Sequence, residues 1–276
     1  MPTIQTIIAL LDSLLNGTVG DVIETLPLNG IEKRFYTFYL ANQNPYLANT
    51  HRSQLSQDLW VALLLNCWSP KSLSNKNGYY VEFGGFDGLT FSNSYLFEKN
   101  FNWKGIIAEP NRCFSDQCRE NRSCIIDNRC IWSESHKKFN FNTVPNSPEL
   151  GTLEIFEKTD CHIDERMAEK QLVSVETVSL IDLLTEHRAP RIIDYLSIDT
   201  EGSELDILNA FDFDKYIFKI ISIEHNFTDS REKICALMAQ NHYMRLPRNV
   251  SYCDDMYINT KRSPHLTRIH HWLMET

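Results

Sequence analysis

From residue 78 onward, short apolar segments alternate with stretches of helical period. Apolar runs bounded by glycine, asparagine and proline predict buried strands, and apolar positions three and four apart predict helices. The predicted strands are Tyr79–Gly84, Gly105–Glu109, Ser123–Asp127, Ile192–Asp199 and Ile220–Glu224. The predicted helices are Ser92–Asn100, Arg112–Asn121, Leu180–Glu186, Ser203–Ala210 and Arg231–Gln240. This alternation indicates an α/β fold with a mostly parallel, doubly wound sheet that helices cover on both faces.

Residues 139–178 interrupt this alternation. The segments Lys138–Asn142, Gly151–Phe156 and Leu172–Val178 have the period of two that is typical of antiparallel strands. We therefore expect an insertion that lies over one edge of the sheet or over the functional site.

The two ends of the chain differ from this pattern. Residues 1–77 predict short helices separated by glycine and proline. Among them Ser56–Trp68 is apolar around nearly its whole circumference, so we expect this helix to be buried. The locally basic residues 261–276 predict a C-terminal tail.

Charge and composition narrow the class of protein. The chain has 27 basic and 36 acidic residues, a net charge of −9, which is the wrong sign for neutralising nucleic-acid phosphates. No apolar run approaches the ~20 residues that span a bilayer, and no basic residue precedes the first apolar run as in a secretory signal. The eight cysteines include no C-x2-C pair. We expect a cytoplasmic protein without a membrane span or a structural zinc site.

The first candidate site is the glycine-rich turn Glu82–Gly88, which follows the first predicted strand. Ligands of open α/β sheets bind at the carboxyl ends of the strands, where glycine lets the backbone approach closely. The spacing differs from the dinucleotide motif G-x-G-x-x-G, and Glu82 would repel phosphate but attract a cation. The alternative is a simple turn without a ligand.

The next two predicted strands also end in polar residues. Glu109 follows the second strand, and its carboxylate could accept hydrogen bonds from both hydroxyls of a ribose. Asn128 follows the third strand and could accept a hydrogen bond from an adenine amino group, although a surface turn explains it equally well.

The last two predicted strands end in a concentration of acids. Asp199 follows one strand, and Glu224, His225 and Asn226 follow the next. These groups suit a divalent cation, a general base, or both, whereas the alternative for His225 is a hydrogen-bonded histidine at the sheet edge. Downstream, Ser203 and Asp206 predict a capping box, and Glu204 would favour the helix dipole.

Several motifs in order resemble the FkbM-type methyltransferases, which use S-adenosylmethionine. The resemblance covers residues 53–225 and rests on Ser53–Asp58, Gly78–Gly88, Ser92–Tyr95, Asn102–Gly105, Glu109–Pro110 and Ile198–Glu204. It implies a Rossmann-like methyltransferase sheet of seven strands whose last strand is antiparallel, and Tyr243–Asn259 suits that ending. It also implies methyl transfer to oxygen, commonly on a sugar or polyketide hydroxyl.

The resemblance also implies roles for individual residues. Glu82, Gly84 and Gly88 would line the methionine part of the cofactor, Glu109 would hold the ribose, and Asp199 would face the sulfonium. The full set expected at the cofactor is Gln54, Asp58, Glu82, Gly84, Gly85, Gly88, Asn93, Glu109, Asn128 and Asp199. Gly85 and Phe86 depart from the commoner alanine and asparagine or histidine of the family.

Two mechanisms stay open at this point. Either His225 or Asp199 acts as a general base, or Asp199, Glu224 and Asn226 bind Mg²⁺ or another divalent cation that lowers the pKa of the acceptor hydroxyl. The expected catalytic residues are accordingly Asp199, Glu224 and His225. The rival functions are a methyltransferase-like binding module without turnover and a nicotinamide-dependent oxidoreductase, which the glycine spacing disfavours.

We expect one methyltransferase domain at residues 78–260, with the insertion at 139–178, a helical N-terminal extension at 1–77 and a tail at 261–276. Residues 1–52, the insertion and the tail would recognise a small-molecule or glycan acceptor. The apolar N-terminal helices offer an interface for a homo-oligomer.

Overall fold

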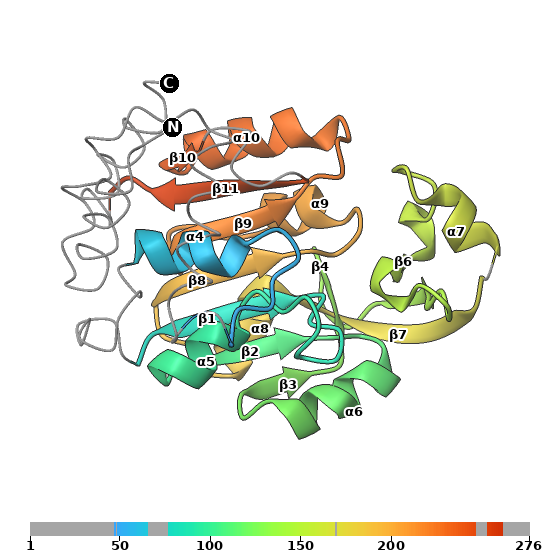
Figure 1. Ribbon diagram of the computed structural model, residues 1–276. Helices are drawn as coiled ribbons and strands as arrows, with labels where there is room; N and C mark the ends of the chain where they lie inside the picture. Colours follow the sequence, from blue (N-terminus) through green and yellow to red (C-terminus); the bar gives the residue numbers. More distant parts are fainter. Residues whose placement is uncertain (1–46, 48, 66–76, 169, 247–252, 262–276) are drawn as a thin grey trace, which may run out of the picture.

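The computed structural model describes residues 47, 49–65, 77–168, 170–246 and 253–261, and seven strands form its main sheet in this part of the chain (Figure 1). They are β1 (Tyr79–Phe83), β2 (Lys104–Ala108), β3 (Ile125–Asp127), β8 (Ile192–Ile198), β9 (Ile217–Glu224), β10 (Tyr243–Arg245) and β11 (Asp254–Asn259). Their order is β10-β11-β9-β8-β1-β2-β3, and only β11 runs antiparallel to its neighbours. The expected mostly parallel sheet with an antiparallel last strand is confirmed.

Alternating side chains of the strands build a hydrophobic core on each face of the sheet. Tyr80 and Tyr195 pack with α4 (Gln57–Leu64) and α5 (Tyr95–Phe101) on one face. Their neighbours Val81 and Leu196 pack on the other face with α8 (Leu180–Glu186), α9 (Glu204–Asn209) and α10 (Ser230–Gln240). Successive side chains of a strand point to opposite faces, so an uninterrupted apolar strand serves both cores.

The insertion forms a second sheet in the order β4-β7-β5-β6. Its elements are β4 (Cys130–Trp132), β5 (Lys138–Asn142), η2 (Pro148–Leu150), β6 (Thr152–Leu153), η3 (Glu154–Phe156), α7 (Ile163–Ala168) and β7 (Leu172–Ser179). The expected antiparallel pairing is confirmed for β5 with β6 and β7. β4, which the pattern did not predict, pairs in parallel with the end of β7. Figure 1 shows the insertion beyond the carboxyl ends of the parallel strands.

Two local predictions are wrong. The helix expected over Ser92–Asn100 begins only at Tyr95, because residues 92–94 fold over the carboxylate of Glu82 and donate hydrogen bonds to it. The predicted capping box at Ser203 does not form. Its hydroxyl donates to Thr200 Oγ1 at 2.8 Å, and the start of α9 has no side-chain cap.

Glu204 does more than favour the helix dipole. Its carboxylate accepts hydrogen bonds from the backbone N–H groups of Thr200 and Gly202 at 3.0 and 3.1 Å. It therefore fixes the turn between β8 and α9. The helices expected before residue 47, the end of the predicted helix Ser56–Trp68 and the tail after residue 261 lie outside the described residues.

Arg122 stabilises the turn after β1 through several buried hydrogen bonds. It follows α6 (Arg112–Asn121), its side chain is fully buried, and its guanidinium donates to Glu98, to the carbonyl of Gly88 and to Tyr80. It also donates to the two serine hydroxyls that bind Glu82, at 2.9 Å each. This one cation therefore connects β1, the glycine turn and α5.

We expect Arg122→Met to lower the free energy of unfolding by about 3–5 kcal/mol, because it leaves two buried carboxylates without their cation. Chemical denaturation followed by circular dichroism measures this change. The matched control is Arg119→Met on the exposed face of α6, whose surface ion pair with Asp116 contributes less than ~1 kcal/mol. Equal losses in the two variants would contradict a structural role for the buried cation.

Candidate active site

A cavity of about 400 Å³ opens at the carboxyl ends of β1, β2, β8 and β9. The insertion forms its outer wall, with Phe141, residues 147–151, His162 and Glu165. The strand order of the sheet reverses at this point, because β1 pairs with β2 on one side and with β8 on the other. This is the place where open α/β sheets bind their ligands, and the volume suits a small molecule.

Glu82 and Asn93 line this cavity beside the end of β1. Glu82 is buried and accepts hydrogen bonds from Ser92 Oγ at 3.0 Å, from the backbone N–H of Asn93 at 2.6 Å and from Ser94 Oγ. Its carboxylate oxygens therefore hold the loop of residues 92–94 and are little available to a ligand. Asn93 Nδ2 donates to Ser197 Oγ at 2.9 Å, while its Oδ1 is buried without a hydrogen-bond partner among the described residues. Asn93 is thus a residue of the cavity lining whose amide oxygen is unused among the described residues.

Gly84 brings the turn after β1 against the end of β8. Its φ is +71°, and a Cβ at this position would lie 2.2 Å from the carbonyl oxygen of Asp199. Only glycine fits there. The other two predicted glycines do not line the cavity: a Cβ on Gly85 would strike Ile107, and one on Gly88 would strike Arg122.

Glu109 lines the cavity directly after β2. Its two carboxylate oxygens accept hydrogen bonds from the backbone N–H groups of Phe86 and Asn111, at 2.9 and 2.8 Å. Burial raises its pKa to about 7, against the opposing effect of these two hydrogen bonds. Each oxygen keeps a second lone pair, so Glu109 can still accept hydrogen bonds from a vicinal diol.

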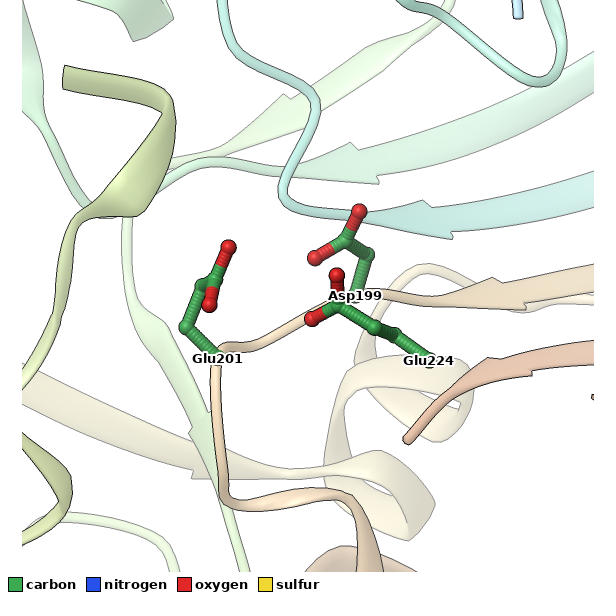
Figure 2. Close-up of side chains that lie close together, drawn as sticks. All are labelled: Asp199, Glu201 and Glu224. Carbon is green, nitrogen blue, oxygen red and sulfur yellow. The ribbon is translucent and has the colours of Figure 1, made fainter. Parts of the chain in front are cut away.

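Three carboxylates gather at the carboxyl ends of β8 and β9, as Figure 2 shows. Asp199, Glu201 and Glu224 have oxygens within 4.8 Å of one another. Loss of water and the charge of the nearby Asp254 together raise the pKa of Asp199 to about 7, against the opposing effect of a hydrogen bond with Glu224. Burial and the charge of Asp199 raise the pKa of Glu201 and of Glu224 well above the usual range. Such a cluster favours bound protons or a cation over three free charges.

Glu201 is a residue of the cavity lining that the sequence reasoning missed. It has a left-handed backbone, with φ of 56°, and accepts a hydrogen bond from Arg166 of α7 at 2.5 Å. Arg166 is fully buried and also pairs with Asp160 at 2.7 Å. Asn226 Nδ2 also donates a hydrogen bond to the carboxylate of Glu201, at 3.2 Å. The only signal in the sequence was the second acid two residues after Asp199, and the left-handed backbone of Glu201 means that the alternation of a strand does not predict where its side chain lies.

A family model described as "Methyltransferase FkbM domain" matches residues 78–257 of the chain. The chain belongs to the FkbM methyltransferase family. No curated protein matched the chain in a separate search. No helix in the described part of this FkbM methyltransferase is long and apolar enough to cross a membrane.

The solved structures found to be similar to this chain share little of its sequence. Methyltransferase FkbM from Methylobacillus flagellatus KT is 9% identical with a TM-score of 0.40, over 80% of this chain and 60% of that one. Precorrin-6y C5,15-methyltransferase from Geobacter metallireducens GS-15 is 11% identical with a TM-score of 0.38, over 76% and 92%. The N-terminal domain of human METTL16 in complex with SAH is 13% identical with a TM-score of 0.36, over 76% and 71%.

The FkbM chain brings only some of the remaining predicted residues to the cavity. Gln54 lines it, and so do Glu224 and Asn226. Asp58 does not; it is buried and binds Ser53 and the backbone of Arg52, so it holds the loop before α4. Asn128 is exposed and does not line the cavity.

His225 also lies away from the cavity lining. Its Nδ1 accepts a hydrogen bond from the backbone N–H of Phe227 at 3.0 Å, and its Nε2 lies 3.9 Å from Asp255. The structure thus agrees with the alternative of a hydrogen-bonded histidine at the sheet edge. The histidine that does line the cavity is His162, from the insertion.

We expect the free energy of unfolding of this FkbM methyltransferase to fall as the pH rises from about 4 to about 7. Asp199 and Glu109 bind protons more tightly in the folded than in the unfolded chain, so folding is favoured below their folded pKa of about 7 and this contribution is lost above it. Asp199→Asn should therefore raise the free energy of unfolding at pH 8 by about 1–3 kcal/mol. Denaturation curves at several pH values test this, with the exposed Asp116→Asn as control. Parallel curves for all three proteins would contradict it.

Proposed function

We propose that this FkbM methyltransferase transfers a methyl group from S-adenosylmethionine to a hydroxyl oxygen of a sugar, a glycan or a related small molecule. The observation that carries the proposal is Asn93, which lines the same cavity as Glu109 and whose buried Oδ1 has no hydrogen-bond partner among the described residues. An amide oxygen and a carboxylate at this cavity match the ammonium group and the ribose diol of the cofactor.

Further features of the cavity fit this cofactor. Gly84 keeps the backbone close to Asp199, in a cradle that a Cβ would fill. Among the described residues that line the cavity there are seven carboxylates and no lysine or arginine. This charge suits a cationic cofactor and disfavours the pyrophosphate of a nicotinamide dinucleotide. The same intact acceptors argue against a binding module that has lost its cofactor.

The chain's own residues would act mainly by positioning. When bound, the cofactor supplies a methyl group on a sulfonium sulfur that leaves as a neutral thioether. Asn93 would hold its ammonium group and Glu109 its ribose, and the insertion would hold the acceptor hydroxyl and exclude water. The Asp199–Glu224 pair would take the hydroxyl proton, because a carboxyl with a pKa of about 7 is an effective general base near neutral pH.

A divalent cation is the second candidate mechanism, favoured by the three carboxylates within 4.8 Å of one another. Two contacts count against it. The guanidinium of Arg166 already neutralises Glu201, and Asn226 directs its amide nitrogen toward Glu201 and not toward a metal position. We therefore favour a reaction that needs no metal.

The net charge of the chain also bears on its partners. A net charge of −9 supports a partner other than nucleic acid. We propose a cytoplasmic enzyme that acts on a neutral acceptor, with the N-terminal residues as an interface between copies of the chain.

We expect the full-length protein to bind S-adenosylmethionine, and its demethylated product, with micromolar or tighter affinity. Asn93→Ala should weaken binding at least about tenfold, because it removes a charge-assisted hydrogen bond in a buried place. Isothermal titration calorimetry measures both. The matched control is Asn128→Ala, which removes an exposed asparagine outside the cavity and should change nothing. No heat with either ligand would refute the cofactor assignment.

We expect incubation with S-adenosylmethionine and a panel of methyl glycosides to give an acceptor whose mass rises by one methylene group, with the new methyl on oxygen. Mass spectrometry and NMR identify the product. Turnover should be the same after dialysis against EDTA, since Arg166 occupies the carboxylate that a metal would need. Activity lost on chelation and restored by Mg²⁺ would favour the metal mechanism instead.

A further inference from the structure

Phe91 differs from the other apolar residues of the cavity wall. Of the exposed large apolar residues in the described part of the chain, Phe91 alone lines the cavity, and 47% of its surface is exposed. It also has a left-handed backbone, with φ of 58°. A bulky residue rarely adopts this conformation, and strained backbones of this kind cluster at sites that bind a ligand. The two features together indicate that a ligand contacts Phe91.

The backbone on both sides of Phe91 is held by a carboxylate. Before it, Asp87 accepts hydrogen bonds from the backbone N–H groups of residues 89 and 90, at 2.8 and 2.6 Å. After it, Glu82 holds residues 92–94 through three hydrogen bonds. The backbone at Phe91 is therefore fixed before a ligand binds, which lowers the entropy cost of binding.

Gln54 is a neighbour of Phe91 in the wall of the cavity. A parallel β-bridge joins Phe91 to Ser53, the residue directly before Gln54. Gln54 is exposed and lines the cavity as well. Its amide has both donors and an acceptor, so it suits either kind of hydrogen bond that a hydroxyl makes. This part of the wall therefore combines an aromatic residue with an amide residue.

A neutral pyranose matches this combination. The face of an aromatic ring carries partial negative charge and attracts polarised C–H groups, which make up one face of many pyranose rings. The hydroxyls at the edge of such a ring suit an amide. Among the described residues of the lining there is no lysine or arginine to pair with a carboxylate or a phosphate. The wall thus favours a neutral sugar over an acidic one.

The adenine of the cofactor has another aromatic residue available to it. Phe86 lines the cavity, and its backbone N–H donates to the carboxylate of Glu109 at 2.9 Å. Glu109 is the residue proposed for the ribose, to which the adenine is directly bonded. Phe91 is therefore left for the acceptor.

We propose that Phe91 and Gln54 form one side of the acceptor subsite, in which the ring of Phe91 stacks on a neutral pyranose and Gln54 binds its hydroxyls. This inference rests on the proposed function and adds to it the residues that select the acceptor. It also gives Gln54 to the acceptor instead of the cofactor.

Saturation-transfer NMR on the full-length protein with excess S-adenosylhomocysteine tests the subsite. The probes are the methyl glycosides of glucose, galactose and mannose, and the methyl glycoside of glucuronic acid as an acidic counterpart. We expect at least one neutral glycoside to bind, with the strongest transfer at the C–H protons of one face of its ring. The acidic glycoside should not bind. Binding of the acidic glycoside as tight as that of the neutral ones would overturn the proposal.

Variants of Phe91 and Gln54 separate the acceptor from the cofactor. We expect Phe91→Ala to weaken the neutral glycoside at least about fivefold, and Phe91→Trp to restore its affinity to within about twofold of wild type. Gln54→Ala should weaken the glycoside about threefold to tenfold, because it removes a hydrogen bond. Calorimetry should show that S-adenosylhomocysteine binds all three variants as it binds wild type.

The matched control is Phe227→Ala. Phe227 is also an exposed phenylalanine with a left-handed backbone, with φ of 57°, but it does not line the cavity. Its removal should alter neither affinity.

Two results with Phe91→Ala would overturn the acceptor subsite. Weaker binding of S-adenosylhomocysteine would assign the ring to the adenine, and unchanged glycoside binding would remove the ring from the subsite. The wild-type protein separates this inference from the proposed function without any variant. If S-adenosylhomocysteine binds and no neutral glycoside does, only the acceptor subsite fails. If S-adenosylhomocysteine does not bind, the proposed function fails and this inference fails with it.

Discussion

The site depends on one buried carboxylate, that of Glu82, whose hydrogen-bond partners all come from the protein itself. Glu82 lies one residue before the end of β1, in a place without water, where an ionised carboxylate is costly unless donors surround it. Two hydroxyls, one backbone N–H and the nearby Arg122 supply this environment. The same contacts draw residues 92–94 out of the following helix and place Asn93 at the cavity. Burial of one acid thus determines where the neighbouring amide points.

The acids on the other side of the cavity are arranged differently. Glu82 has its partners in the fold, but Asp199 and Glu224 face mainly one another and further acids. Glu201 adds a left-handed backbone conformation that a side chain disfavours. Repulsion and strain of this kind lower stability, and proteins retain them where a ligand or a reaction uses them. The contrast separates the acids that hold the fold from those that meet a ligand.

Much of this could be predicted from the sequence, because buried strands of a parallel sheet are plainly apolar. Because ligands bind at the carboxyl ends of such strands, the predicted strand ends identified Glu109, Asp199 and Glu224 as candidates. Glu224 and Asn226 line the cavity, whereas His225 between them points toward Asp255. Asn226 and Glu201 follow their strands with left-handed backbones, so the alternation typical of a strand does not predict where their side chains lie.

Other parts could not be predicted, because they depend on contacts between distant segments. Arg166 lies 35 residues before its partner Glu201, within an insertion whose own helix is only six residues long. Neither local propensity nor spacing links the two. The role of Gly85 and Gly88 is similar: both sit in a motif that suggests a ligand, yet their lack of a side chain makes room for Ile107 and Arg122.

The pairing of β4 with the end of β7 gives the insertion a particular construction. Cys130 lies opposite Thr177 and Trp132 opposite Ser179, so the chain enters and leaves the insertion through adjacent strands. The outer wall of the cavity is thereby a module on a two-stranded stem, bound to the sheet domain again through Arg166 and Glu201. A lineage that exchanged this module for another could alter the acceptor while the cofactor cradle stayed the same, provided that the arginine and its glutamate were inherited together.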